Sequence, residues 1–145
     1  MKTILMALAV AVSAAAPAVA SDFATGETAC ASVAPILEIV DRPYANPHHR
    51  DPAEVIELAL NRRLYHITSR APGTIEAFYS ARNVRADITI TYTDTTYSIR
   101  YKSSENLQYG QGRINAHYNR WVNNLDHDLQ EEFAIPAPTG SPPPG

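Results

Sequence analysis

The sequence predicts a two-layer α+β domain in which a helix, four antiparallel strands and a second helix follow one another along the chain (α-β-β-β-β-α). Three observations lead to this fold class. Residues 51–64 open with a helix-start signal and repeat apolar side chains every four positions, residues 65–102 alternate with period two, and residues 113–129 carry one apolar stripe of helical spacing. We place the domain at residues 51–133.

The first helix is predicted from its capping signals. Asp51 suits the N-cap, Pro52 suits the first helical position, and Glu54 stands three residues after the cap. Arg62 and Arg63 fall in the last turn, where the helix dipole favours cations. The apolar stripe of this helix is Ile56, Leu60 and Leu64.

Four strands are predicted between the helices, separated by turns of two or three residues that contain Pro, Gly, Asn or Asp. Such short connections join antiparallel neighbours, so the strands form a meander. In the last two strands apolar and polar residues alternate, which is typical of a sheet covered on one face only. Both helices should therefore lie on the same face. The predicted strands are residues 65–70, 74–81, 84–92 and 96–102.

The second helix is predicted to start near Arg113, after Gly110 and Gly112. Its far end carries acidic residues, where the helix dipole prefers cations, so we expect that end to fray. The apolar stripe of this helix consists of Ile114, Tyr118, Trp121, Val122, Leu125 and Leu129.

Both ends of the chain differ in composition from the domain. Residues 1–20 have the pattern of a signal peptide: Lys2, a short apolar run and small residues before a cleavage point near Ala20. The run is shorter than the ~20 residues that span a bilayer. We therefore expect a periplasmic or secreted protein without a transmembrane segment. Residues 21–50 are predicted to be a flexible leader and residues 134–145 a disordered, Pro-rich tail.

The charge balance and the single cysteine narrow the possible partners. The formal net charge is −3 and no basic run is present, which argues against nucleic acid. Cys30 is the only cysteine, so it can form no intramolecular disulfide. It remains open as a lipid attachment site, a mixed-disulfide site or an incidental thiol. Polar residues such as Asp22 and Glu27 separate it from the apolar run, which disfavours lipid attachment.

Catalytic and metal-binding motifs are not evident in the sequence. It contains no G-x-S-x-G, no H-E-x-x-H and no phosphate-binding glycine loop. We therefore predict no catalytic residue, no metal and no cofactor. The adjacent His48 and His49 are interpreted as solvated loop residues, and His117 and His127 as surface residues too far apart along one helix to share a metal.

Asparagine is unusually dense in the second helix, although each one costs up to ~0.7 kcal/mol relative to alanine. Two interpretations stay open. The amides hydrogen-bond the backbone of the preceding loop and fix the helix entry, or they form a surface with tyrosines that recognises an extended peptide or a glycan. The candidate ligand-binding residues are Asn106, Tyr109, Asn115, Tyr118 and Asn119.

Two short motifs support a resemblance. An S-x-N-L-x-Y loop at residues 104–109 and a Y-N-x-W helix motif at residues 118–121 follow a Tyr-rich hairpin. In this respect residues 88–129 resemble small exported proteins of Gram-negative bacteria, which are often lipid-anchored and mostly without an assigned function. The resemblance implies a periplasmic location and a compact α+β fold, and it implies no activity.

Two hypotheses for the function follow. The first is a small periplasmic binding or adaptor module of the cell envelope, whose partner is an envelope protein, a peptide or a glycan. The alternative is a small hydrolase-like enzyme that uses His66 or His117 with nearby tyrosines. The lack of a catalytic motif and the small size of the domain favour the module.

Overall fold

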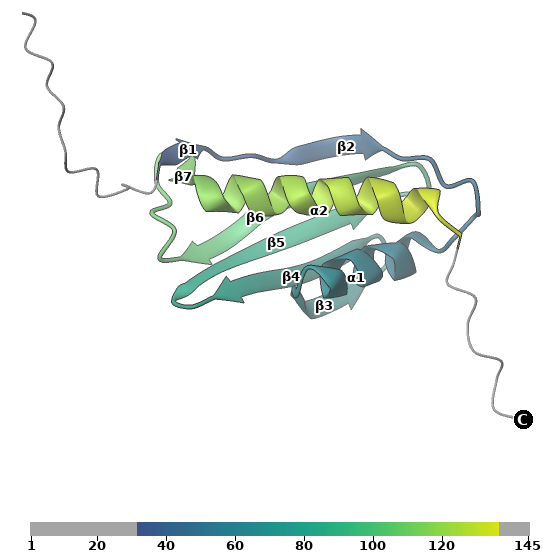
Figure 1. Ribbon diagram of the computed structural model, residues 1–145, viewed down its shortest axis with the longest axis horizontal. Helices are drawn as coiled ribbons and strands as arrows, with labels where there is room; N and C mark the ends of the chain where they lie inside the picture. Colours follow the sequence, from purple (N-terminus) through teal and green to yellow (C-terminus); the bar gives the residue numbers. More distant parts are fainter. Residues whose placement is uncertain (1–31, 137–145) are drawn as a thin grey trace, which may run out of the picture.

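The computed structural model describes residues 32–136, and Figure 1 shows two helices packed with a five-stranded sheet and a two-stranded ribbon. The predicted signal peptide, Cys30 and the tail from residue 137 onward lie outside the described residues. The elements are β1 (Val33–Pro35), β2 (Ile39–Pro43), α1 (Pro52–Arg62), β3 (His66–Ala71), β4 (Thr74–Ala81), β5 (Val84–Tyr92), β6 (Thr96–Glu105), β7 (Arg113–Asn115) and α2 (Ala116–Ala134).

The main sheet has the order β2-β6-β5-β4-β3, with every neighbouring pair antiparallel. The predicted meander is confirmed in β3 to β6. The predicted number of four strands is wrong, because β2 adds a fifth strand to the free edge of β6, with Ile39 opposite Ile99. The register shifts between Ile39 and Arg42, and Asp41 has a φ of 46°. This irregularity disrupts the alternation by which a strand is recognised.

The segment expected to be a flexible leader is therefore part of the fold from Val33 to Pro43. β1 pairs with β7 in a separate two-stranded ribbon, and β2 belongs to the main sheet. A hydrogen bond from the backbone N–H of Asp41 to Ser98 Oγ (2.9 Å) adds to the β2–β6 pairing.

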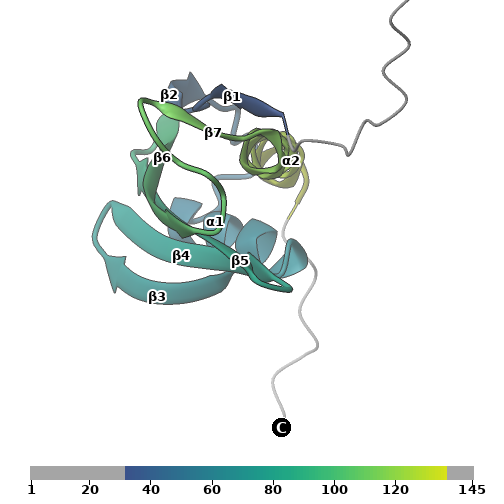
Figure 2. The same cartoon turned by 90° about the vertical axis from the view of Figure 1, so that its left-hand side faces the viewer.

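One face of the sheet is apolar and both helices lie on it, as the alternation predicted (Figure 2). The other face is polar and includes Thr89 and Arg100. Burial of the apolar face drives the assembly of the two layers. The side chains that are fully buried between the two layers include Ile75, Ile88, Ile90, Tyr97 and Ile99 from the strands, and Ile56, Leu60, Leu125 and Phe133 from the helices.

The start of α1 is as predicted. The Asp51 carboxylate accepts from the backbone N–H of Ala53 (2.8 Å), and Pro52 opens the helix. The end differs from the prediction, since the helix stops at Arg62 and Leu64 leaves the apolar stripe. Leu64 has a φ of 60° and is 72% exposed.

The boundaries of α2 correct two expectations. The helix starts at Ala116 rather than near Arg113, because residues 113–115 pair with β1 and Asn115 is the N-cap. Its acidic end does not fray within the helix, which continues to Ala134. Asp128 and Glu132 are buried there and pair with arginines around α1. Within residues 32–136, neither helix has the length and apolar character needed to cross a membrane.

Candidate functional site

Two of the candidate amides have internal partners and form what we call the amide clasp, Asn115 and Asn119. Asn119 Oδ1 accepts from the backbone N–H of Leu37 (2.9 Å), and its Nδ2 donates to the carbonyl oxygen of Pro35 (2.8 Å). Asn115 Oδ1 caps α2 by accepting from the backbone N–H of His117 (3.0 Å). Asn119 thus joins the end of β1 and the residues after it to α2. The amides have internal backbone partners, as the structural interpretation expects. The expected partner, the loop before the helix, is wrong, because Asn119 bonds residues of the N-terminal segment and Asn115 caps its own helix.

The other three candidates lie in different surroundings. Asn106 donates to the carbonyl oxygen of Asn83 (2.6 Å), and Tyr109 is half exposed and stacks on Tyr101 with ring centroids 4.5 Å apart. Tyr118 is buried, and burial raises the pKa of its hydroxyl, which finds no hydrogen-bond partner among the described residues. Because Tyr118 and Asn115 are both buried, the five candidates do not form one accessible surface.

The two histidines of the enzyme hypothesis are exposed and lie on different elements. His66 stacks on Phe78 of the neighbouring strand, with ring centroids 5.0 Å apart. His117, in the first turn of α2, has Trp121 as its aromatic neighbour at 6.4 Å. Neither imidazole pairs with a tyrosine ring among the described residues, and the use of these histidines with nearby tyrosines stays a prediction.

A groove of about 370 Å³ opens where the end of α1, the start of β3, β4 and α2 meet. We call it the arginine–aromatic groove. Among the described residues, its lining contains three arginines and three aromatic residues but no carboxylate. The lining residues are Arg62, Arg63, Leu64, Tyr65, Tyr79, Arg120, Trp121 and Asn124.

The aromatic wall of the groove is a chain of three tilted rings. Trp121 and Tyr79 have centroids 4.7 Å apart at 56°, and Tyr79 and Tyr65 have centroids 5.5 Å apart at 46°. Tyr65 is buried, which raises the pKa of its hydroxyl and keeps it neutral. Trp121 and Tyr79 are only partly buried, so they offer ring surface to a ligand in the groove.

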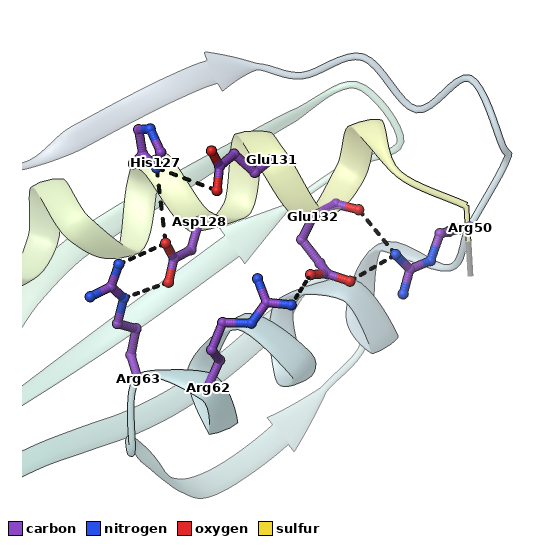
Figure 3. A network of polar contacts seen from close by, with 7 residues as sticks. All are labelled: Arg50, Arg62, Arg63, His127, Asp128, Glu131 and Glu132. Carbon is purple, nitrogen blue, oxygen red and sulfur yellow. Dashed lines mark hydrogen bonds and ion pairs between the residues drawn. The ribbon is translucent and has the colours of Figure 1, made fainter. Parts of the chain in front are cut away.

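Two of the three arginines are held by carboxylates of α2 (Figure 3). Arg63 forms two parallel hydrogen bonds with Asp128, of which Nη2 to Oδ1 measures 2.8 Å, and this guanidinium lowers the pKa of Asp128. Arg62 Nη2 lies 2.7 Å from Glu132 Oε2. Glu132 also accepts from the buried Arg50, whose Nη1 is 3.0 Å from Oε1. We call these five residues the arginine–carboxylate network.

Arg120 differs from the other arginines of the groove. It is exposed, and no hydrogen bond or ion pair engages its guanidinium within residues 32–136. It precedes Trp121 and lies one turn before Asn124, so the three side chains share one region of the helix surface. The groove therefore presents a free guanidinium and an amide next to exposed ring surface.

Two other places were considered as sites. One ligand atom each from His127, Asp128 and Glu131 lies within 4.8 Å of the others, but Arg63 already bonds both oxygens of Asp128, so a cation would have to displace a guanidinium. A second hollow of about 450 Å³ includes Asp94 beside Arg50 in its lining, which gives it no clear charge preference.

The groove is not predictable from the separate patterns that predict its parts. The apolar stripe places Trp121 in the core, and the helix dipole accounts for Arg62 and Arg63. The available signal is an arginine, Arg120, next to the only tryptophan of the sequence. Comparisons of the chain with family models, with curated proteins and with solved structures found no match.

Proposed function

We propose that this protein is a small periplasmic binding module of the bacterial cell envelope, and that it holds an anionic ligand with an apolar or ring-shaped part in the arginine–aromatic groove. The observation that carries the proposal is Arg120, which has no hydrogen-bond or ion-pair partner within residues 32–136 and shares its groove with the partly exposed rings of Trp121 and Tyr79. A volume of about 370 Å³ lies within the range of small-ligand sites, roughly 300–1,000 Å³.

The chemistry of the lining supports binding rather than turnover. A general base or an activated nucleophile requires a group that can exchange a proton near neutral pH. Arginine stays protonated, and the buried Tyr65 hydroxyl has a raised pKa. Within residues 32–136 the lining holds no histidine, cysteine or carboxylate, so these residues suit the binding of a ligand better than its cleavage.

The proposed location is supported by the sequence at residues 1–20, with its basic start, apolar run and small residues before Ser21. The resemblance of residues 88–129 to small exported proteins points the same way. An exported protein whose arginine–aromatic groove binds an anion would fit the role of a carrier or adaptor for an envelope component.

The single tryptophan makes the proposal directly testable. Because Trp121 is the only tryptophan and lines the groove, intrinsic fluorescence reports from this place alone. A ligand screen of anionic aromatic compounds and anionic sugars should find members that shift or quench the emission with saturation. Arg120→Ala should weaken those ligands by at least about tenfold, the loss of a hydrogen bond to a charged group.

The matched control is Arg100→Ala. Arg100 is also an exposed arginine, but it lies on the polar face of β6, away from the helices, and it pairs with Glu38 (3.5 Å). Its removal changes the net charge of the protein by the same amount and should leave the affinity unchanged. Equal losses in the two variants would mean that the ligands respond to overall charge and would refute the assignment to the groove.

A further inference from the structure

We infer that the arginine–aromatic groove recognises a carboxylate attached to an aromatic or apolar group. This inference rests on the proposed function and specifies its ligand. It follows from three properties of the groove: the arginine that is left without a carboxylate partner, the geometry of the hydrogen-bond donors on α2, and the apolar residue at the rim.

The pairing of the arginines leaves Arg120 as the guanidinium open to a ligand. Arg63 is matched one to one by Asp128. Arg62 shares Glu132 with Arg50, so the network keeps one positive charge, but both oxygens of this 1% exposed carboxylate are already bonded. Arg120 is left as the one guanidinium of the lining without a partner within residues 32–136. One carboxylate would balance it, whereas a dianion would also have to compete for arginines that are already bonded.

The donor geometry fits a planar anion. A guanidinium presents a rigid fork of N–H groups that matches the two oxygens of a carboxylate. Asn124 lies one turn after Arg120 on α2 and adds an amide donor from the same side of the helix. A carboxylate bound to Arg120 and Asn124 would lie beside Trp121, and the group attached to it would extend over the rings of Trp121 and Tyr79.

The rim of the groove is apolar on the side of α1. Leu64 is 72% exposed and has a φ of 60°, a left-handed conformation that is unfavourable for a bulky side chain. The end of α1 accounts for this conformation, since the Leu64 N–H donates to the Asn61 carbonyl (3.0 Å). The Tyr65 N–H donates to the Leu60 carbonyl (2.9 Å), which completes the hydrogen-bond pattern by which a helix commonly ends. The result is a large apolar side chain turned toward solvent next to the aromatic wall. A ligand ring that covers Leu64 and Trp121 would remove apolar surface from water, which favours binding.

Two sources supply this chemistry. One is a free aromatic carboxylate. The other is the C-terminus of a peptide whose last residue is aromatic, in which the carboxylate and the ring are joined by the backbone. The groove would contact the same groups in both, so the two are separated by experiment.

The experiment is a fluorescence titration of the mature protein with matched probes, using the signal of Trp121. The free-ligand probes are 3-phenylpropionate, its carboxamide and phenyl phosphate, which is largely a dianion at neutral pH. The peptide probes are N-acetyl-Gly-Gly-Phe with a free and with an amidated C-terminus. We expect both carboxylates to bind and both amides to bind about tenfold to a hundredfold more weakly.

Leu64→Ala tests the apolar rim. It should weaken 3-phenylpropionate several-fold while leaving the affinity for acetate unchanged, because acetate has no ring to cover the leucine. A circular dichroism spectrum and an unfolding curve like those of the parent protein establish that this variant is folded. If Leu64→Ala weakened the binding of both ligands equally, this would contradict the proposal that the ring of the ligand covers Leu64.

The outcomes separate this inference from the proposed function. If phenyl phosphate binds more tightly than the carboxylates, or if the amides bind as well as the acids, the carboxylate inference is overturned while the binding function stands. If neither these probes nor the ligand screen perturb Trp121, both are refuted. Tighter binding of the free peptide than of 3-phenylpropionate assigns the groove to C-termini, and the reverse order assigns it to a free carboxylate.

Discussion

The two ends of α2 are fixed to the rest of the fold by different chemistry. At the start, the amide clasp uses neutral hydrogen bonds from Asn115 and Asn119 to backbone groups. At the far end, the arginine–carboxylate network uses the charged groups of Asp128 and Glu132 (Figure 3). The α2 residues that line the arginine–aromatic groove lie between these two ends, and the groove shares Arg62 and Arg63 with the network.

The difference is explained by the unfavourable electrostatic and desolvation terms that are present at one end of α2 and absent from the other. Carboxylates near the C-terminus of a helix are opposed by the helix dipole, and burial adds a desolvation cost. Arg62 and Arg63 at the end of α1 offset both effects, and they are themselves favoured there by the dipole of α1. The clasp involves no charge and only needs to satisfy backbone donors and acceptors. A substitution in the network should therefore cost more stability than one in the clasp.

The largest effect is expected for Glu132→Ala. This change leaves the buried Arg50 without its carboxylate partner, and breaking a buried ion pair from one side typically costs about 3–5 kcal/mol. The free energy of unfolding from urea titration measures the loss. Glu131→Ala is the matched control, since Glu131 is exposed and, among the described residues, forms an ion pair only with His127; its stability should stay within about 0.5 kcal/mol of the parent. A loss below about 1 kcal/mol for Glu132→Ala would contradict this account.

The next effect is expected for Asn119→Ala. The change leaves the Leu37 N–H and the Pro35 carbonyl unpaired, at a cost of about 1–3 kcal/mol, from which up to ~0.7 kcal/mol of improved helix propensity is subtracted. The exposed Asn123→Ala is the control and should gain that propensity without a loss. If both variants become more stable, Asn119 makes no effective internal bonds, and the recognition interpretation of the amides would regain support.

A smaller effect, the dependence of stability on pH, distinguishes the two ends of α2. Arg63 lowers the pKa of Asp128 in the folded protein, so the stabilisation from this pair is present above the unfolded pKa of about 3.9 and is lost as the pH falls through the folded value. The stability difference between the parent protein and Asp128→Asn should be constant at neutral pH and shrink below about pH 4. The deficit of Asn119→Ala should not depend on Asp128 and should persist over the same range.

The comparison also explains which features could be predicted from the sequence. The strands β3 to β6 and the start of α1 were predictable because local alternation and the Asp51-Pro52 cap determine them. β2 was missed because its bulge breaks the alternation, and the start of α2 was misplaced because residues 113–115 pair with a distant strand. Both errors concern contacts between residues far apart in sequence, which local patterns do not encode.

The same reason explains the candidate site. Asn119 was singled out correctly as unusual, but its partners in β1 and beyond could not be deduced from its neighbours in sequence. The prediction that the end of α2 frays rests only on the dipole of that helix. It omitted Arg62 and Arg63, which α1 brings into contact some 65–70 residues earlier in the chain. The groove depends on that helix contact and so was not predictable.

The smallest change in stability is expected for Arg120→Ala, the substitution that should matter most for the groove. The side chain is exposed and has no hydrogen-bond or ion-pair partner within residues 32–136, so the free energy of unfolding should change by no more than about 0.5 kcal/mol. Unfolding measurements on this variant, together with fluorescence titration, show whether Arg120 stabilises the fold or binds the ligand. If the variant loses stability as Glu132→Ala does, Arg120 belongs to the scaffold. If stability is retained and carboxylate binding is lost, the region between the two fixed ends of α2 is free to serve recognition, because neither end depends on it.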